Sequence, residues 1–491
     1  MSKLHRSLAA LILLSLFSGF AFSFDTGPHF DLTRAVLSER GFGDDAIKSV
    51  QVENWLTDYF STSPTISKNK REELEKLHCD NLFTTRQVDN YFVWLINNLK
   101  VSTQNAARNN DNLAMITTLG IGLHAIQDFY THSNWVETHP RQPNGPYLTD
   151  TFHGPTFTKQ LSLRGALFTG KYPSERKSGP WADPIPDNAQ NHGGYDAGLN
   201  HDSPVRERWD EAYVFAYVAS HELVEAFAKW ADETRPGFWK KVQMFAVDQA
   251  EKKKLEYDIA ALRSLSMWIK GGGEDGHWKG NKSGSDRFLS AYSPKWLAAS
   301  SSIFVKQMKD GSIPKQISEN LYTKAEPPAM PDLPRFSLSR RAVIVRTTFI
   351  GESKDIGLFK GKISAMNGSD FYARITIGKQ EYWDRVVQAS NESTDPWYEI
   401  HFADTTETSV PIKIAVFDED NIDPSKDPEM DINARAGFKS LSLVFNPNNG
   451  PVSDDLTGIF STRETAFTSV GAKPDNNRTV IKGYVAQIPL R

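Results

Sequence analysis

The segment Leu119–Glu137, LGIGLHAIQDFYTHSNWVE, constrains the fold of this chain more than any other. Its apolar residues recur at alternating spacings of three and four, which predicts a helix with one face in a core. His124, Asp128 and His132 follow one another at intervals of four, so on that helix they line another edge. A histidine and a carboxylate one turn apart can hold a zinc ion together. His124 and His132 are two turns, about 11–12 Å, apart, which predicts more than one ion.

A single His-xxx-acid pair is more typical of a polar seam inside a helix bundle than of a metal site. The pattern returns, however, at His221 and Glu225 in ASHELVEAF, another segment with helical apolar spacing. It is not the zincin motif HExxH, because Glu225 stands where the second histidine is required. Two helices that each offer such a pair favour metal binding over the seam.

The first 23 residues read as a secretory signal peptide. Lys3 and Arg6 precede an apolar run from Leu8 to Phe20, and Ala21-Phe22-Ser23 has small residues where signal peptidase needs them. Cleavage there would make Phe24 the mature N-terminus and would predict a secreted or periplasmic protein.

Composition excludes some classes of protein. Hydrophobic residues make up 39% of the chain and charged residues 24%, as in soluble globular proteins. Cys79 is the only cysteine, so no intrachain disulfide can form. The net charge of −4 and the lack of a basic stripe make nucleic acid an unlikely partner.

Three further metal-competent residues precede the long helix. His29 in TGPHFD, Asp58 in NWLTDYF and His78 in KLHCDN would each suit an ordinary turn or surface position if taken singly. Together with the two helical sets they make eight side chains. An open zinc site takes about three protein ligands, so eight would serve two or three ions and leave positions for water.

The order of these residues resembles the zinc-dependent phospholipase C family, whose all-helical fold is shared with the single-strand-specific zinc nucleases of fungi and plants. The segment DFYTHSNWVE is most similar to the bacterial Het-C-like branch of this family. The resemblance implies three zinc ions, the first held by the amine and carbonyl of the N-terminal residue. Their ligands would be Phe24, His29 and Asp128 for the first, Asp58, His78, His124 and Asp128 for the second, and His132, His221 and Glu225 for the third.

The chain departs from that family at the third ion. His132 follows Asp128 by four residues, where better-known members have six, so His139 or His153 could take its place. The Gly/Pro/Asn-rich stretch GPWADPIPDNAQNHGGYDAGLNHDSP is expected to be a loop that shapes the substrate site or a solvated excursion. Its histidines, His192 and His201, are assigned no role.

The pattern changes from helical to strand-like after a proline-rich linker. Residues 24–325 are expected to form the helical zinc domain, with helical signal returning between Trp296 and Met308, and 326–335, EPPAMPDLPR, the linker. Residues 336–491 then show period-two runs separated by turns, which predict an antiparallel β-sandwich. The expected strands are Ala342–Ile350, Phe371–Ile377, Tyr398–Phe402, Ile412–Phe417, Leu441–Phe445 and Val480–Ile488. The fold class is therefore a multidomain α + β protein.

The β-region resembles a C2 domain, a module that binds membranes through calcium-loaded loops, and a helical zinc domain before such a sandwich is the order found in the clostridial alpha-toxin group. Clustered carboxylates suit Ca²⁺, although Ser364 stands where C2 domains usually have a further acid. A sandwich that binds calcium and a sandwich that does not are equally expected. The matching acids are Asp370, Asp418, Asp420, Asp423 and Asp427, with Asp431 as a further choice.

The resemblance implies a secreted phospholipase C that cleaves the phosphodiester of membrane glycerophospholipids to diacylglycerol and a phosphorylated head group. Zinc-bound hydroxide would attack phosphorus, and Asp58 would orient or deprotonate the water. Two alternatives stay open: a zinc-dependent single-strand nuclease, and a non-catalytic Het-C-like membrane or toxin protein in which zinc stabilises the fold.

Overall fold

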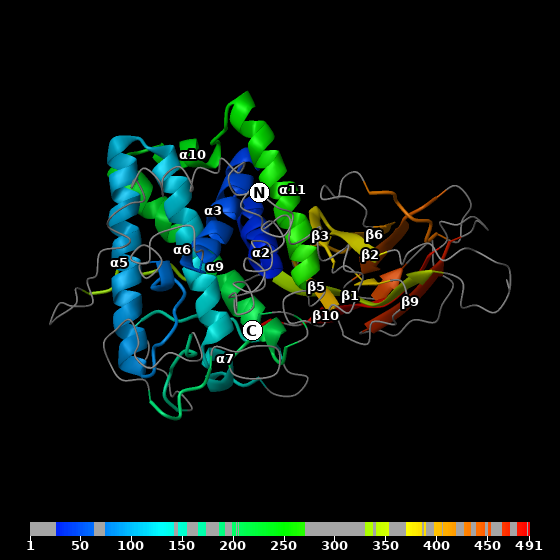
Figure 1. Ribbon diagram of the computed structural model, residues 1–491, viewed down its shortest axis with the longest axis horizontal. Helices are drawn as coiled ribbons and strands as arrows, with labels where there is room; N and C mark the ends of the chain where they lie inside the picture. Colours follow the sequence, from blue (N-terminus) through cyan, green and yellow to red (C-terminus); the bar gives the residue numbers. More distant parts are fainter. Residues whose placement is uncertain are drawn as a thin grey trace, which may run out of the picture.

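The structure is a computed structural model in which a helical domain precedes two β-sheets (Figure 1). It describes residues 26–62, 74–141, 146–154, 165–172, 186–191, 199–202, 204, 206–270, 329–336, 340–352, 370–384, 387–388, 397–404, 406–418, 427–433, 438–446, 450–452, 464–471, 479–488 and 490–491.

Within the described residues, six long helices make the body of the helical domain, and α7 and α10 are short. Their bounds are α2 Thr26–Glu39, α3 Asp44–Thr62, α5 Thr85–Asn109, α6 Asn112–His132, α7 Trp135–Thr138, α9 Trp209–Thr234, α10 Phe238–Gln243 and α11 Gln249–Lys270. In Figure 1, α5 lies at the edge farthest from the strands, and α2 and α11 lie nearest to them.

Local sequence sets where α5 and α6 begin. The Thr84 side chain accepts a hydrogen bond from the Gln87 backbone N–H, and Asp111 accepts one from Ala114, so each caps a helix whose first N–H groups lack partners. Asn110 adopts a left-handed conformation that ends α5. Every residue of α6 from Met115 to His132 is buried, so this helix runs through the middle of the domain.

Helices α3 and α6 pack in unusually close contact at Gly120. A Cβ placed on Gly120 would lie 2.5 Å from the Cβ of Glu53 and 2.9 Å from the Asn54 backbone nitrogen. Only glycine allows this approach. It brings the face of α3 that carries Asn54 and Asp58 toward His124, which is one turn beyond Gly120.

The strands form two antiparallel sheets. One has the order β5-β1-β10-β9, and the other β3-β2-β6-β7-β8 with β4 paired to β2. Their bounds are β1 Arg340–Glu352, β2 Asp370–Ile377, β3 Gln380–Trp383, β4 Val387–Gln388, β5 Trp397–Asp404, β6 Val410–Asp418, β7 Leu441–Asn446, β8 Gly450–Val452, β9 Glu464–Val470 and β10 Thr479–Ile488.

Strand β1 is buried on both of its faces. Val343 and Val345 belong to the core between the two sheets, whereas Ala342 and Ile344 belong to the core of the helical domain. Because side chains alternate along a strand, one sheet serves two cores. Phe402 of β5 adds to the contact between this sheet and the helical domain. Its ring stacks on Tyr217 of α9, with centroids 3.7 Å apart.

The expected fold class is confirmed, with helices first and an antiparallel sandwich after them. Each of the six expected strands lies within a strand of the structure, and β3, β4, β8 and β9 are additional. The change from helix to strand falls between Lys270 and Arg340, an interval that includes the expected linker. The expected helical signal at 296–308 lies outside the described residues. None of the described helices is both long and apolar enough to cross a membrane.

Candidate metal centre

Four separate parts of the helical domain bring the metal-competent side chains together. His29 comes from α2, Asp58 from α3, and His78 from the turn before α5, while α6 supplies both His124 and Asp128. All five are buried. Within the described residues the structure forms two groups of three donors whose ligand atoms lie within 4.8 Å of one another, namely Asp58, His78 and His124, and His29, His124 and Asp128.

The first group has donor separations that match a zinc site. His78 Nε2 lies 3.4 Å from Asp58 Oδ1 and 3.4 Å from His124 Nε2. His124 Nε2 in turn lies 3.3 Å from Asp128 Oδ2. Donors around a tetrahedral zinc, with bonds of about 2.0–2.1 Å, lie about 3.3 Å from one another. The separations and the donor types therefore fit a metal ion at this position.

The second group adjoins the first through Asp128. Asp128 Oδ1 lies 3.0 Å from His29 Nε2, while Oδ2 faces His124. The rings of His29 and His124 are stacked with centroids 4.7 Å apart. One carboxylate thus presents an oxygen to each imidazole, which is the arrangement needed to bridge two ions.

Burial and charge prepare these side chains for a cation. Burial by itself would raise the pKa of Asp128, but the charge of His124 and hydrogen bonds from His124 and His29 outweigh it, so the pKa lies well below its usual range. Burial lowers the pKa of His124, and Asp128 opposes this only in part. An ionised carboxylate beside a neutral imidazole is the protonation state in which both bind metal.

Cys79 follows His78 but belongs to neither group. Burial raises the pKa of its thiol well above the ordinary value, and Sγ donates a hydrogen bond to the Ala125 carbonyl at 3.1 Å. A neutral thiol held in this way is a packing residue.

His132 is not brought into either of these groups. Its Nε2 lies 3.2 Å from Asp202 Oδ1, and its Nδ1 lies 3.3 Å from the Leu199 carbonyl. The loop that contains Asp202 is held against the end of α6 by a hydrogen bond from the His201 N–H to the Thr131 carbonyl. Asp202 was not expected from helical spacing, because it reaches His132 from a distant loop.

His221 and Glu225 face α2 and do not join His132. Arg40 Nε donates to His221 Nδ1 at 2.9 Å, so the ring proton is on Nε2, which donates to Glu39 at 3.0 Å. Both ring nitrogens are therefore in use. The same guanidinium also reaches Glu225 Oε2 at 3.2 Å, and its fixed positive charge disfavours a cation there. The described residues thus do not assemble the expected third site.

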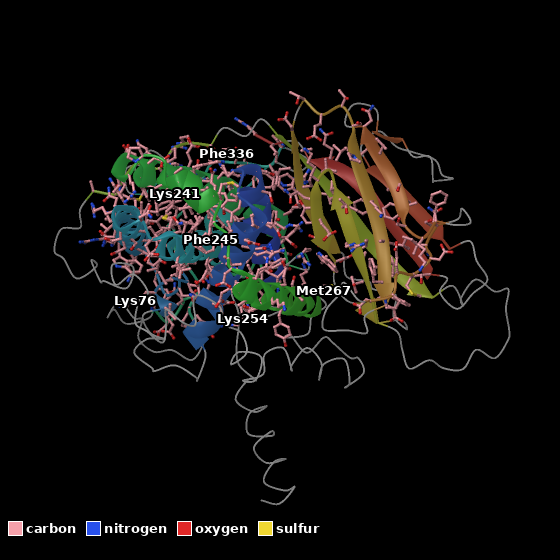
Figure 2. The ribbon with its side chains drawn as sticks, turned by 90° about the horizontal axis from the view of Figure 1, so that it is seen from above. Lys76, Lys241, Phe245, Lys254, Met267 and Phe336 are labelled. Atoms are coloured by element: carbon pink, nitrogen blue, oxygen red, sulfur yellow. The ribbon has the colours of Figure 1, made fainter. Side chains whose placement is uncertain are left out.

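His221 and its neighbour Glu222 instead contact Phe336, the residue that follows the expected linker 326–335. The Phe336 ring stacks on His221, with centroids 4.2 Å apart and planes 5° apart. The Phe336 N–H donates to Glu222 Oε1 at 3.1 Å, and the Arg40 guanidinium lies over the Phe336 ring, 5.3 Å from its centroid. Figure 2 labels Phe336 among the helices.

The remaining histidines have other neighbours or lie outside the described residues. His139 stacks on Trp135, His153 lies 3.2 Å from Glu222, and His201 lies 3.2 Å from Glu137. Phe24 and His192 are not among the described residues, so the role of the Phe24 amine stays a prediction.

The acids expected to bind calcium are placed only in part. Asp370 begins β2 and Asp418 ends β6, where it pairs with Phe371. Asp427 is buried and accepts a hydrogen bond from the Tyr372 hydroxyl at 3.2 Å. Asp420 and Asp423 lie outside the described residues. Calcium binding here stays untested.

Comparison with known proteins gives a match over part of the helical domain. Residues 42–151 match the family model of the VWA7 N-terminal domain. Four of the five clustered donors, Asp58, His78, His124 and Asp128, fall inside the VWA7 match, and His29 precedes it. Human von Willebrand factor A domain-containing protein 7 is 54% identical over 43 residues, which are 9% of this chain. The match spans only 5% of that protein's length.

Two solved structures were also matched. The alpha toxin from Clostridium absonum is 13% identical over 89% of this chain and all of its own, with a TM-score of 0.12. An alpha-toxin of Clostridium perfringens from avian strain SWCP is 12% identical over 84% of this chain and 98% of its own, also with a TM-score of 0.12. Scores this low carry no argument.

The expectation of a secreted phospholipase C is wrong, because the family model and the human relative both point to a VWA7-like protein. Its nuclease and toxin-like alternatives, its action on phospholipids and the C2 assignment are withdrawn with it. The strands still form an antiparallel sandwich. The expected signal peptide, residues 1–23, lies outside the described residues, so export stays a prediction.

Proposed function

We propose that the helical domain binds two zinc ions, bridged by Asp128, and uses them to hydrolyse a phosphate ester. The observation that carries the proposal is the run of donor separations of 3.4, 3.4 and 3.3 Å from Asp58 through His78 and His124 to Asp128. The proposal has two zinc ions instead of the expected three, because Glu39 and Arg40 contact both ring nitrogens of His221.

The donor chemistry favours zinc over harder cations. The five residues offer three imidazole nitrogens and two carboxylates, and imidazole suits Zn²⁺ better than Mg²⁺ or Ca²⁺, which prefer oxygen. Asp58, His78, His124 and one oxygen of Asp128 would hold the first ion. His29 and the other oxygen of Asp128 would hold the second, which leaves it positions for water and for a phosphate oxygen.

This arrangement supports hydrolysis. Bound zinc lowers the pKa of a coordinated water and polarises a phosphoryl oxygen. Asp128 would fix the spacing of the two ions. The ion held by His29 and Asp128, with only two protein donors, would be the one with positions left for substrate. Asp58 bonds through Oδ1 toward His78, and its second oxygen is our candidate for orienting the attacking water.

The first test is the metal content of purified protein by mass spectrometry. We expect two zinc ions per chain, one in His29→Ala, and two in the matched control His221→Ala, whose imidazole faces Arg40. Less than one zinc per wild-type chain, after dialysis against buffered zinc, would overturn the metal site.

The second test measures cleavage of bis(p-nitrophenyl) phosphate. Zinc-loaded protein should release nitrophenol, and chelation or Asp58→Asn should reduce the rate at least a hundredfold. Two bound zinc ions with no cleavage would refute hydrolysis and leave zinc binding standing.

A further inference from the structure

Two carboxamide side chains lie directly behind the clustered histidines. Gln127 Oε1 is 2.6 Å from His29 Nδ1, and Asn54 Oδ1 is 3.3 Å from His124 Nδ1. The two amides also contact each other, since Asn54 Nδ2 donates to Gln127 Oε1 at 3.1 Å. Asn54 and Gln127 are both buried.

The Thr33 hydroxyl, shared by both amides, favours one orientation for each: its oxygen can accept from two NH₂ groups, but its single hydrogen could not serve two amide oxygens. Gln127 Nε2 donates to Ser220 Oγ at 3.2 Å and lies 3.4 Å from Thr33 Oγ1. Asn54 Nδ2 donates to the same Thr33 hydroxyl at 3.2 Å. If Gln127 were turned over, its NH₂ group would face the NH₂ group of Asn54, two donors with no acceptor between them.

This orientation decides the tautomer of both histidines. An amide oxygen only accepts hydrogen bonds, so His29 and His124 must each carry a proton on Nδ1. The lone pair of each neutral ring is then on Nε2, the nitrogen that faces Asp128. Partners of this kind orient ligating histidines and set the strength with which they bind.

We propose that Asn54 and Gln127 are positioning residues of the metal centre, and that the hydrogen bond between them couples the two ion positions. The inference rests on the proposed zinc site. Gln127 acts on the ion at His29, and Asn54 acts on the ion at His124. Because Gln127 Oε1 accepts from both His29 and Asn54, a shift of one ring is passed to the amide that holds the other.

The neutrality of these amides also has a chemical effect. Many zinc-bound histidines donate instead to a carboxylate, which adds negative charge and raises the basicity of the ring. Here the charge near the ions comes from Asp58 and Asp128 alone among the clustered donors. Amide partners hold the rings in place without that addition, so the ions stay more electrophilic.

Zinc affinities measured by competition with a chromophoric chelator test the proposal. Gln127→Leu should weaken one ion and Asn54→Leu the other, each by roughly 10- to 100-fold. The double variant should lose less than the product of the two single effects, because each also disturbs the other ion. Gln127→Glu, which keeps an acceptor for His29 Nδ1, should bind at least as tightly as wild type.

The matched control is Ser220→Ala, which removes a partner of Gln127 Nε2 without touching a histidine. It should keep both affinities within about threefold of wild type, far less than the losses expected from the amide variants. Circular dichroism and the melting temperature of chelated protein separate a metal effect from misfolding. If wild type binds two ions and both leucine variants bind them unchanged, the positioning role fails. If wild type binds none, the proposed function itself fails.

A measurement on the wild type avoids variants altogether. Long-range ¹H–¹⁵N spectra of zinc-loaded protein report which ring nitrogen carries the proton. We expect Nδ1–H on His29 and His124, and zinc bound through Nδ1 on either ring would overturn the proposal.

Discussion

Gly120 of α6 lies so close to Glu53 of α3 that a Cβ placed on Gly120 would be 2.5 Å from the Glu53 Cβ. Real Cβ atoms do not approach so closely, and the atoms that they would meet belong to a helix and cannot swing away. The close spacing of α3 and α6 therefore requires glycine, whose side chain is a hydrogen atom, at position 120.

Gly120→Ala should push α3 away from α6 and cost about 1–3 kcal/mol of unfolding free energy. It should also weaken zinc binding, because Asp58 and His124 lie on the two helices that separate. Gly122→Ala is the matched control, since its Cβ would meet only side-chain atoms of Phe227 and Leu99 at 3.1–3.2 Å. Denaturant titration and zinc analysis compare the two, and equal zinc content in both would contradict the prediction.

Asp128→Asn should remove more metal than any other single change in the cluster. The amide can offer one neutral oxygen, whereas the carboxylate presents an oxygen to both His29 and His124. We expect fewer than one zinc per chain, against one for His29→Ala. Mass spectrometry of the two variants decides the matter, and equal losses would argue against bridging.

Phe336→Ala should loosen the joint between the helices and the sheets. It removes the stack on His221 and the contact with Arg40, while the backbone bond to Glu222 can persist. We expect a loss of roughly 2 kcal/mol, below the range for a fully buried phenylalanine because Phe336 is half-buried. Calorimetry should show the single transition broaden or split, and zinc content should not change. Phe438→Ala, at a ring that is 63% exposed, is the control.

Stability should fall as the pH rises through 6 because of Asp210. Burial raises the pKa of this carboxyl from 3.8 to about 6, with Arg141 opposing and Glu211 adding to the rise. The Tyr147 hydroxyl donates to it. The folded protein therefore holds a proton that the unfolded chain releases near pH 4, and this stabilisation is complete below pH 4 and lost above pH 6.

Two pKa units limit the size of this effect to about 3 kcal/mol. Asp210→Asn should remove it, so the difference in unfolding free energy between variant and wild type should change between pH 4 and pH 7. Denaturation of chelated protein at four pH values in that range measures the difference. A constant difference would show that Asp210 titrates normally.

Sequence patterns predicted the parts of the site that lie within one helix or at the beginning of a helix. The spacing alone puts His124 and Asp128 on one helix face, and in the structure His124 Nε2 lies 3.3 Å from Asp128 Oδ2. Spacing did not predict the neighbours of His221, because it defines a face of α9 without saying what packs on it. Glu39 at the end of α2 and Arg40 just after it reach that face from about 180 positions earlier, and their contacts use both ring nitrogens.

The β-region shows the same limit. Strands rich in apolar residues, such as β1 and β6, were predicted from their patterns. Strand β9, Glu464–Val470, was missed because its sequence ETAFTSV is largely polar, and pairing with β10 holds it in place. The apolar pattern of a single strand does not reveal this kind of support, because it depends on the neighbouring strand.

The double burial of β1 has a consequence for the order in which the protein forms during synthesis. The sheet that covers the helices pairs β1 with β5 on one side and with β10 on the other. The ribosome delivers β10 last of these, long after β1 has emerged. Until then one edge of β1 has open backbone groups, and such edges attract other chains. The nascent protein therefore needs this edge shielded during the interval, and variants that slow translation between β5 and β10 should raise its aggregation.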